Sequence, residues 1–112
     1  MKLSVVVPCY NEEENIPLIL ERFGEVIKRE DIEIILVNNG STDNSARILA
    51  ELLPKYPFAK TVLVEVNQGY GYGILQGLYM CQGEYIGWTH AAMQTDPADI
   101  MRALEIIQRE RG

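Results

Sequence analysis

The residues of this chain that could do chemistry lie in four short polar segments. The segments are Pro-Cys-Tyr-Asn-Glu at 8–12, Asn-Asn-Gly-Ser-Thr-Asp at 38–43, Asn-Gln-Gly-Tyr-Gly at 67–71 and His-Ala-Ala-Met-Gln-Thr-Asp at 90–96. They contain hydroxyl, imidazole and carboxyl groups and glycine-rich turns, so hydrolysis and phosphate binding are the first chemistries to consider. Each segment alone also has a structural explanation, because Asn-Gly is a common turn signal and loop glycines supply backbone freedom.

Neither of these two chemistries has its usual sequence pattern here. Ser41, Asp43 and His90 could form a catalytic triad on paper, but no G-x-S-x-G motif presents a serine nucleophile. No P-loop occurs, and the glycines at 69–73 lack the G-x-G-x-x-G spacing of a dinucleotide-binding turn. His90 is the single histidine, and by itself it is typical of a hydrogen-bonded structural residue.

Four apolar runs precede the polar segments and are short enough to be buried strands. Three of them, 3–7, 32–37 and 61–66, are rich in β-branched residues, and the fourth, 84–89, is more aromatic. The polar segments therefore lie where the predicted strands end.

A helix is predicted over 12–28, directly after the first strand. Its apolar stripe recurs at spacings of three and four residues and consists of Ile16, Leu20, Phe23 and Ile27. Asn11 followed by Glu14 is a capping-box pattern, and the acidic residues of the first turn favour the positive end of the helix dipole. We therefore expect Asn11 to cap this helix.

Three more helices are predicted farther along the chain. Residues 41–43 open the second helix and Pro54 ends it. Its inward residues are expected to be Ala46, Leu49, Ala50 and Leu53. The third helix, about 72–81, is short and contains glycine, and the fourth opens at Asp96 and Pro97. The apolar face of the fourth is expected to be Ile100, Leu104 and Ile107.

The order of these elements is βαβαβαβα, which defines an α/β fold. Such alternation predicts a parallel sheet with helices on both faces, as in Rossmann-like domains, and ligands of such sheets bind outside the carboxyl ends of the strands. We expect one domain over residues 1–112 with the four polar segments at one edge. A flavodoxin-like receiver would need an aspartate at the end of a central strand, but the first two strands end at Pro8 and Asn38.

Composition and charge argue against several other classes of protein. The net charge is −6 and the basic residues are scattered, so nucleic acid is not an expected partner. Cys9 and Cys81 are far apart and form no C-x-x-C pair, as expected of reduced thiols. The apolar runs are too short for a signal peptide or a membrane span, so a cytoplasmic location is expected.

Five motifs occur in order along nearly the whole chain. They are Val-Val-Val-Pro-Cys-Tyr-Asn-Glu at 5–12, Ile-Leu-Val-Asn-Asn-Gly-Ser-Thr-Asp at 35–43, Asn-Gln-Gly at 67–69, Gly-Glu-Tyr-Ile at 83–86 and the segment 91–97. Together they resemble the N-terminal half of family-2 glycosyltransferases of GT-A fold, such as polyprenyl-phosphate sugar transferases. Each motif is weak alone, but the ordered set is specific.

The resemblance implies that a nucleoside diphosphate sugar binds across the strand ends. The residues expected to bind the nucleotide are Pro8, Tyr10, Glu12, Asn38, Asn39 and Gly69. In the family, the residues that match the first three contact the nucleoside, and an acidic residue at one of the two asparagine positions helps to hold the base. Asparagine changes the pattern of hydrogen-bond donors and acceptors, so UDP-linked and GDP-linked sugars both stay open.

The family's metal site is an Asp-x-Asp motif at the end of the fourth strand, and a nearby Gln can also bind the ion. The matching positions are His90, Ala92 and Gln94. Mg²⁺ or Mn²⁺ prefers oxygen ligands and neutralises charge on the departing diphosphate. Without a carboxylate, His90 and Gln94 should bind the ion weakly, so this chain is expected to be inactive or impaired. An engineered Asp→Ala substitution is the preferred explanation, and a naturally degenerate homologue is the alternative.

No catalytic residue can be assigned from the sequence. The family's catalytic base and acceptor-binding region follow the fourth helix, so the resemblance implies a truncated chain that keeps donor binding but not transfer. In an intact parent the sugar would pass with inversion to a lipid-phosphate or saccharide acceptor, which would place the parent at the cytoplasmic face of a membrane. An unpaired edge of the fourth strand predicts a homodimer. The alternative function is a non-catalytic nucleotide-binding or assembly module on the same fold.

Overall fold

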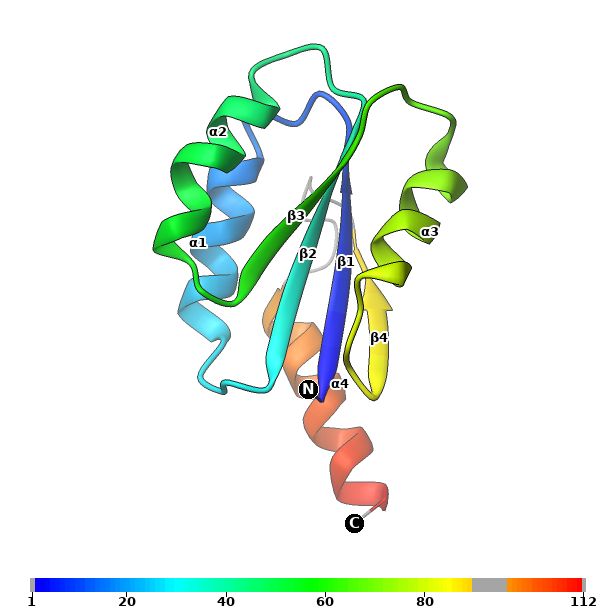
Figure 1. The fold of residues 1–112 in the computed structure, drawn as a ribbon. Helices are drawn as coiled ribbons and strands as arrows, with labels where there is room; N and C mark the ends of the chain where they lie inside the picture. Colours follow the sequence, from blue (N-terminus) through cyan, green and yellow to red (C-terminus); the bar gives the residue numbers. More distant parts are fainter. Residues whose placement is uncertain (1, 90–96, 112) are drawn as a thin grey trace.

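The four apolar runs of the sequence form one sheet, with helices between them. The computed structural model describes residues 2–89 and 97–111. Along the chain the elements are β1 (Leu3–Cys9), α1 (Ile16–Val26), β2 (Ile32–Asn39), α2 (Ser45–Leu52), a 3₁₀ turn (Leu53–Lys55), β3 (Ala59–Val64), α3 (Tyr70–Tyr79), β4 (Tyr85–Trp88) and α4 (Pro97–Arg111) (Figure 1). The predicted α/β order is confirmed.

The strands pair in parallel throughout the described sheet, in the order β3-β2-β1-β4. Every residue of β1 and β2 is buried, as expected of parallel strands that are covered on both faces. β1 continues beyond the predicted end at Val7 to Cys9, and β2 continues beyond Val37 to Asn39. Cys9 and Asn38 still pair across the sheet, so polar residues of the expected site lie within the ends of the strands.

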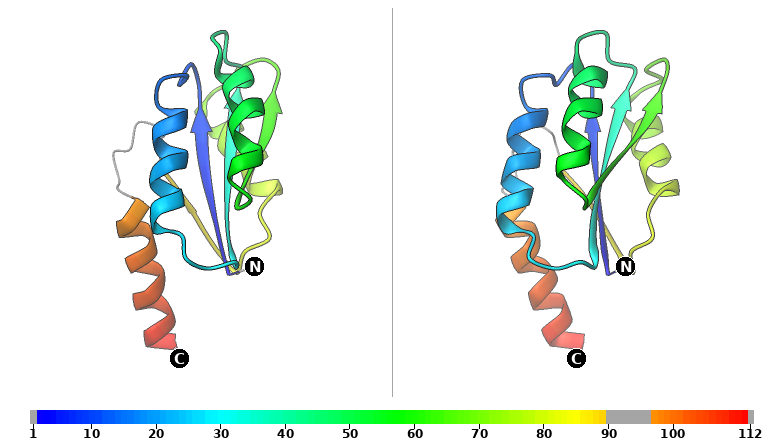
Figure 2. Two further views of the ribbon diagram at one scale, coloured as in Figure 1. Left: turned by 90° about the vertical axis from the view of Figure 1, so that its left-hand side faces the viewer. Right: turned by 60° about the vertical axis from the view of Figure 1, so that its left-hand side comes forward.

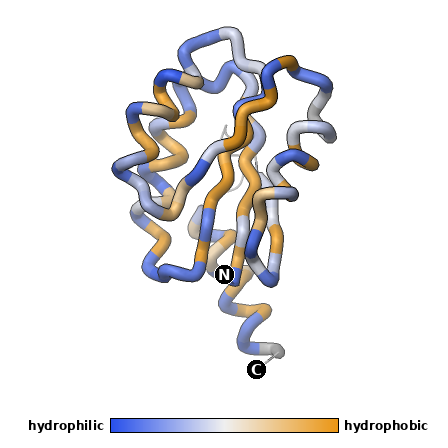
Figure 3. Tube along the Cα trace, in the orientation of Figure 1, coloured by the Kyte–Doolittle hydropathy of each residue, from blue (hydrophilic) through white to orange (hydrophobic). Residues whose placement is uncertain are grey.

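Helices cover both faces of the sheet, as predicted (Figure 2). One face carries α1, α2 and α4, which pack on alternate strand residues: Leu3, Val5, Val7 and Cys9 of β1 with Ile32, Ile34 and Leu36 of β2. The other face carries α3, which packs on a smaller core of Val6, Ile35, Val37 and Val64. Figure 3 shows that apolar residues concentrate in the strands, whereas the loops that follow β1 and β2 are mostly hydrophilic.

The start of α1 differs from the prediction. The helix begins at Ile16 rather than at Glu12, and Asn15 occupies the N-cap position without a side-chain capping bond. Asn11 lies in the preceding bend with a positive φ of 52°, and its side chain bonds to a neighbouring loop. The predicted capping box is therefore wrong. The apolar stripe is confirmed, with Ile16, Leu20 and Phe23 buried and Ile27 partly buried.

The inward face of α2 also differs from the prediction. Leu49 is buried, and the partly buried residues beside it are Ile48, Leu52 and Leu53. Ala46 and Ala50 are exposed, so the prediction that they face inward is wrong. The larger side chains take the inward positions because they remove more apolar surface from water. The helix ends before Pro54, as predicted, and begins at Ser45.

α3 lies close to the sheet because a glycine faces it. A Cβ atom on Gly77 would lie 2.5 Å from Val6 Cγ1 and 2.8 Å from Val37 Cγ2. Any larger residue would have to move the helix or the strands. α3 begins at Tyr70 rather than at the predicted Tyr72.

α4 begins at Pro97, as predicted, and packs beside α1. Leu104 is buried and Ile100 is partly buried in the larger core. Ile107 is 39% exposed, so the prediction that it faces inward is wrong. Within residues 2–89 and 97–111, no helix is long and apolar enough to cross a membrane.

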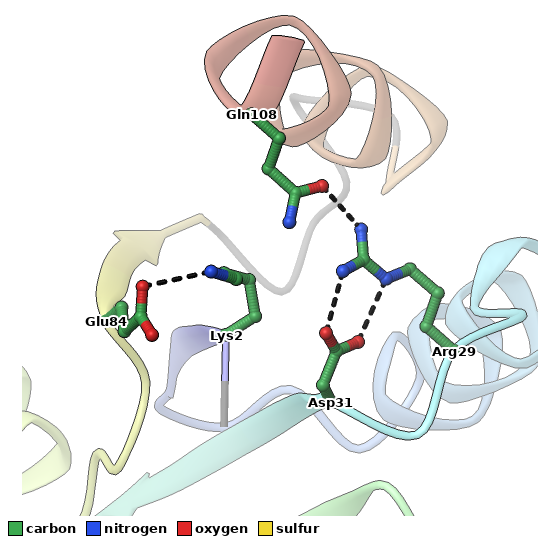
Figure 4. Close-up of polar contacts among 5 residues, drawn as sticks. All are labelled: Lys2, Arg29, Asp31, Glu84 and Gln108. Carbon is green, nitrogen blue, oxygen red and sulfur yellow. Dashed lines mark hydrogen bonds and ion pairs between the residues drawn. The ribbon is translucent and has the colours of Figure 1, made fainter. Parts of the chain in front are cut away.

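Polar contacts hold α4 and β4 at the amino ends of the strands (Figure 4). Arg29 Nη2 lies 2.7 Å from Asp31 Oδ2, and Arg29 Nη1 donates to Gln108 Oε1 of α4 at 2.7 Å. Lys2 Nζ donates to Glu84 Oε2 at 3.0 Å. These contacts lie at the opposite end of the sheet from the expected site.

Candidate functional site

Three loops leave the sheet at the edge where the carboxyl ends of β1, β2 and β3 meet (Figure 1). The loops are residues 10–15, 40–44 and 65–69. Open parallel sheets bind ligands at this edge. The predicted metal-binding positions follow β4 and lie outside the described residues: His90, Ala92 and Gln94.

Asn11 joins the loop after β1 to the loop after β2. Its backbone N–H donates to Ser41 Oγ at 3.1 Å, and its Oδ1 accepts from the Thr42 backbone N–H at 2.8 Å. The left-handed backbone of Asn11 aims the short amide across the gap between the loops, a conformation that asparagine tolerates better than most residues. The two loops are therefore held as one surface.

Asp43 makes a second bond between the same two loops. Its Oδ2 accepts from the Glu13 backbone N–H at 3.2 Å, and its Oδ1 accepts from the Ser45 backbone N–H at 2.9 Å, where α2 begins. Desolvation alone would raise the pKa of Asp43, but the hydrogen bonds from Ser45 and Glu13 outweigh it and lower the pKa. The carboxylate is thus charged at neutral pH and already occupied by the protein.

The loop after β2 also contacts the loop after β3. Gly40 has a positive φ of 68°, and a Cβ atom there would lie 2.3 Å from the Asn67 backbone nitrogen. Both the backbone shape and the close approach require glycine at this position. Asn67 Oδ1 in turn accepts from the Gly69 backbone N–H at 2.8 Å.

Asn38 and Asn39 point to opposite faces of the sheet, because successive strand residues alternate. Both side chains are only 3% exposed. Asn38 Oδ1 accepts from the Ser41 backbone N–H at 3.3 Å, and Asn39 Nδ2 donates to the Gly69 carbonyl at 3.2 Å. Asn39 Oδ1 is buried without a hydrogen-bond partner among the described residues, which leaves an acceptor beside the start of α3.

The remaining predicted nucleotide-binding residues are distributed along this edge. Pro8 is buried within β1, whereas Tyr10, the first residue after this strand, is 48% exposed. Glu12 is partly buried, and its Oε2 accepts from Asn15 Nδ2 at 2.7 Å. Gly69 has a φ of 106° and lies at the N-terminus of α3. The structure thus brings Asn39 and Gly69 into contact and leaves the ring of Tyr10 accessible.

Cys9 is not available as a nucleophile. Burial and, to a smaller extent, the charge of Glu12 raise the pKa of the Cys9 thiol to about 12. The thiol is therefore protonated at neutral pH, and the thiolate is the reactive form of cysteine.

An acidic pocket of about 380 Å³ lies beside the joined loops after β1 and β2. It is lined by Asn11, Glu12, Glu13, Glu14, Asn15 and Asp43. Its carboxylates repel phosphate groups, so this pocket is not suited to a diphosphate. Within the described ranges, no group of three or more His, Cys, Asp or Glu residues is placed to hold a metal ion.

A larger cavity of about 640 Å³ lies at the amino ends of β2 and β3, between Ile27 and Phe58. Its lining includes the cationic residues Lys28, Arg29 and Lys60. Lys60 Nζ already lies 2.8 Å from Glu33 Oε1, and Arg29 Nη2 lies 2.7 Å from Asp31 Oδ2. The cavity is remote from the polar loops, and this end of a parallel sheet is not the usual ligand-binding end.

Several residues that shape this edge were not assigned a part in joining its loops from the sequence. Gly73 approaches Asn39 so closely that a Cβ atom would lie 2.7 Å from Nδ2. Gly40, Ser41 and Thr42 join the loops. The Asn-Asn-Gly-Ser-Thr-Asp run signalled a turn, but its bonds reach residues about thirty positions away, which a local pattern does not reveal.

Comparison with curated proteins finds relatives that are named as undecaprenyl-phosphate sugar transferases. The chain is 36% identical to an undecaprenyl-phosphate 4-deoxy-4-formamido-L-arabinose transferase from Photorhabdus laumondii. The match covers 96% of this chain and 34% of the relative. The chain therefore spans about a third of the length of the curated relatives it matches.

Solved structures show the same fold. S. aureus TarS 1-349 superposes with a TM-score of 0.84 at 25% identity, over 97% of this chain and 33% of that one. The complex of TarS 1-349 with UDP-GlcNAc gives 0.81 at 25% identity, over 97% and 32%. Mannosyltransferase PcManGT from Pyrobaculum calidifontis, in complex with GDP-Man and Mn²⁺, gives 0.75 at 25% identity, over 80% and 27%. The predicted GT-A fold is confirmed.

The family model described as Glycosyl transferase family 2 matches residues 4–112. This range runs from the second residue of β1 through α4 and contains all three described loops of the edge. Because the match covers nearly the whole sequence, the chain belongs to glycosyl transferase family 2.

Proposed function

We propose that this chain binds a nucleoside diphosphate sugar at the carboxyl edge of the sheet. The observation that carries the proposal is the convergence of three loops, joined by Asn11, Gly40 and Asn39 into one polar surface. The TarS and PcManGT structures hold UDP-GlcNAc and GDP-Man, respectively. Both lines of support point to a nucleotide sugar rather than to a free sugar or a nucleic acid.

The residues of this edge suit the neutral part of the nucleotide. Tyr10 offers an exposed ring on which a base can stack, a contact that contributes about 1–3 kcal/mol. Asn39 Oδ1 is a buried acceptor without a protein partner in the described part of the chain, and a base or ribose N–H or O–H would satisfy it only if the contacts around it opened. We expect Pro8, Glu12, Asn38 and Gly69 to complete the nucleoside site.

A lipid phosphate is the acceptor that the names of the curated relatives suggest. In an inverting transfer, an acceptor oxygen forms a bond to the anomeric carbon while the bond to the diphosphate breaks. The nucleoside diphosphate leaves with the electron pair. An ionised phosphate has no proton to lose, so it needs no general base. The relative from Photorhabdus laumondii is named for undecaprenyl phosphate.

We further propose that this chain binds a divalent ion weakly and transfers sugar poorly. The segment expected to bind the ion has His90, Ala92 and Gln94, which include no carboxylate. A bound Mn²⁺ or Mg²⁺ would supply charge neutralisation for the departing diphosphate. This donor set fits such an ion poorly, so nucleotide binding without transfer is the expected behaviour, as in a non-catalytic module.

Calorimetric titration with UDP and GDP, each with and without Mn²⁺, tests the proposal. One of the two nucleotides should bind, and Mn²⁺ should change its affinity little. The variant Ala92→Asp should gain about tenfold or more in affinity when Mn²⁺ is present, because a carboxylate adds an anionic ligand.

Ala91→Asp is the matched control, because it adds the same charge one position away. It should not gain Mn²⁺-dependent affinity. If neither UDP nor GDP binds the unaltered chain or Ala92→Asp, the nucleotide-binding proposal is wrong. Equal gains in the two variants would contradict the metal assignment alone.

A further inference from the structure

The loop after β1 contains a residue with a strained backbone. Asn11 has a φ of 52°, in the left-handed region that residues with a side chain rarely adopt. Strain of this kind costs free energy, persists only where the surrounding structure holds it, and is found mainly at functional sites. The contacts that hold Asn11 therefore bear on the function of this edge.

Three hydrogen bonds to the loop after β2 hold Asn11 in this conformation. Its backbone N–H donates to Ser41 Oγ at 3.1 Å. Its Oδ1 accepts from the Thr42 backbone N–H at 2.8 Å and from Thr42 Oγ1 at 3.3 Å. We call these three bonds the loop clasp. A change to an ordinary negative φ would turn the backbone N–H and the side chain of Asn11 away from these partners, so the strained backbone and the loop clasp depend on each other.

The loop clasp closes a ring of contacts around Tyr10. Cys9, the last residue of β1, pairs with Asn38 in the sheet. Asn38 Oδ1 accepts from the Ser41 backbone N–H at 3.3 Å, and Ser41 Oγ accepts from the backbone N–H of Asn11. Both neighbours of Tyr10 along the chain are thus fixed to β2 or to the loop after it. The backbone of Tyr10, and with it the direction in which its ring leaves the chain, is set by this ring of contacts.

The fold does not depend on the loop clasp. Beyond Asn11, the Glu13 backbone N–H donates to Asp43 Oδ2 at 3.2 Å, which joins the same two loops a second time. α1 is anchored separately by buried apolar side chains, which are Ile16, Ile19, Leu20 and Phe23. Loss of the loop clasp should therefore free the backbone around Tyr10 while α1 stays packed on the sheet.

We propose that Asn11 is a positioning residue for nucleotide binding, which acts by holding Tyr10 through the loop clasp. This inference rests on the nucleotide-binding function proposed above. A loop that is ordered before the ligand arrives loses less conformational entropy on binding, so the ligand binds more tightly. Without the loop clasp, this ordering has to occur during binding and weakens it.

Calorimetric titration with UDP and GDP tests the positioning role in two variants of the loop clasp. Asn11→Gly keeps the left-handed backbone without steric cost but removes Oδ1. Ser41→Ala removes the acceptor of the Asn11 backbone N–H. Each variant should bind the nucleotide about tenfold more weakly, which corresponds to about one net hydrogen bond. Ser41→Thr keeps the hydroxyl group and should restore most of the affinity.

A double variant shows whether Asn11 acts through Tyr10. Tyr10→Ala removes the ring, so adding Asn11→Gly to it should weaken nucleotide binding much less than Asn11→Gly does in the unaltered chain. A general loss of stability would weaken binding equally in both backgrounds. An undiminished effect of Asn11→Gly in the Tyr10→Ala chain therefore overturns the positioning role.

Asn44→Ala is the matched control, because Asn44 lies in the same loop as Ser41, is exposed and makes no side-chain capping bond. It should bind the nucleotide like the unaltered chain, and circular dichroism should show that every variant is folded. Unchanged affinity in Asn11→Gly, or an equal loss in Asn44→Ala, overturns the positioning role alone. If neither nucleotide binds the unaltered chain, the proposed function is wrong and the positioning role fails with it.

Discussion

Glu33 joins several segments of the chain through one buried carboxylate. Ser4 Oγ and the Gln82 backbone N–H donate to Oε2 at 2.5 Å and 2.7 Å, and Lys60 Nζ lies 2.8 Å from Oε1. The Gly83 backbone N–H donates to Ser4 Oγ at 2.8 Å. Desolvation alone would raise the pKa of Glu33, but the hydrogen bonds from Lys60, Ser4 and Gln82 outweigh it and lower the pKa. This carboxylate therefore fixes the connection from α3 to β4 on the sheet.

Glu33→Gln should reduce the free energy of unfolding by about 3 kcal/mol. The amide would direct its own N–H groups at donors and would leave Lys60 without its ionic partner. Urea denaturation measures the change. Glu25→Gln is the control, because the Arg22–Glu25 pair is exposed and should change stability by less than about 1 kcal/mol. Equal losses in the two variants would show that the Glu33 network has no special role.

At this scale the sequence predicted which residue types gather at the edge, but not their partners. Asn11 with Glu14 fits a capping box, yet the partner of Asn11 is Thr42 in the next loop. The local pattern cannot distinguish a helix-capping bond from a bond to the next loop, because Asn11 Oδ1 is the acceptor in both. Three of the four polar segments were nevertheless correctly placed at the strand ends, and the fourth, residues 90–96, lies outside the described residues.

At the scale of elements, glycine sets the distance between α3 and the sheet. Gly77→Ala should destabilise the protein by about 1–3 kcal/mol, because its Cβ would lie 2.5 Å from a methyl group of Val6. Gly71→Ala is the matched control in the same helix, since a Cβ there meets nothing within 4 Å. It should be neutral or stabilise by up to about 1 kcal/mol through helix propensity. Thermal unfolding of both variants checks this, and equal effects would contradict close packing at Gly77.

Element types were predictable, whereas inward faces were less so. The β-branched runs identified the strands because buried parallel strands have few polar residues in their interior. In α2, Ala46 and Ala50 have helical spacing but are exposed. In α4, the period that placed Leu104 inward does not extend to Ile107, which is 39% exposed. Periodicity cannot show where a helix stops touching its neighbour.

At the scale of the whole molecule, acid should destabilise the fold. The hydrogen bond from Arg29 lowers the pKa of Asp31, and hydrogen bonds outweigh desolvation to lower the pKa of Glu33 and Asp43. The ordinary pKa is 3.8 for the two aspartates and 4.5 for Glu33. At a pH near these values, the unfolded chain therefore binds more protons than the folded one. The stabilisation of the fold by these carboxylates is complete at a pH above these ordinary values. It is lost as the pH falls through the lower pKa values of the folded protein.

Urea denaturation at pH 7 and at about pH 3 measures this loss. The urea concentration at the transition midpoint should be lower in acid. Glu33→Gln should reduce the difference between the midpoints measured at the two pH values. An unchanged midpoint would mean that these carboxyl groups titrate alike in the folded and unfolded chain.

An Asn-Gly sequence, Asn39 and Gly40, lies at the carboxyl edge of the sheet, and such sequences can deamidate. In an Asn-Gly sequence the glycine nitrogen can attack the asparagine side-chain carbonyl, release ammonia and form a succinimide, which water then hydrolyses to aspartate or isoaspartate. Here β2 holds the backbone, Asn39 is 3% exposed and its amide donates to the Gly69 carbonyl, so deamidation requires the strand end to open. The rate of deamidation at this position is therefore controlled by how often this end of β2 opens.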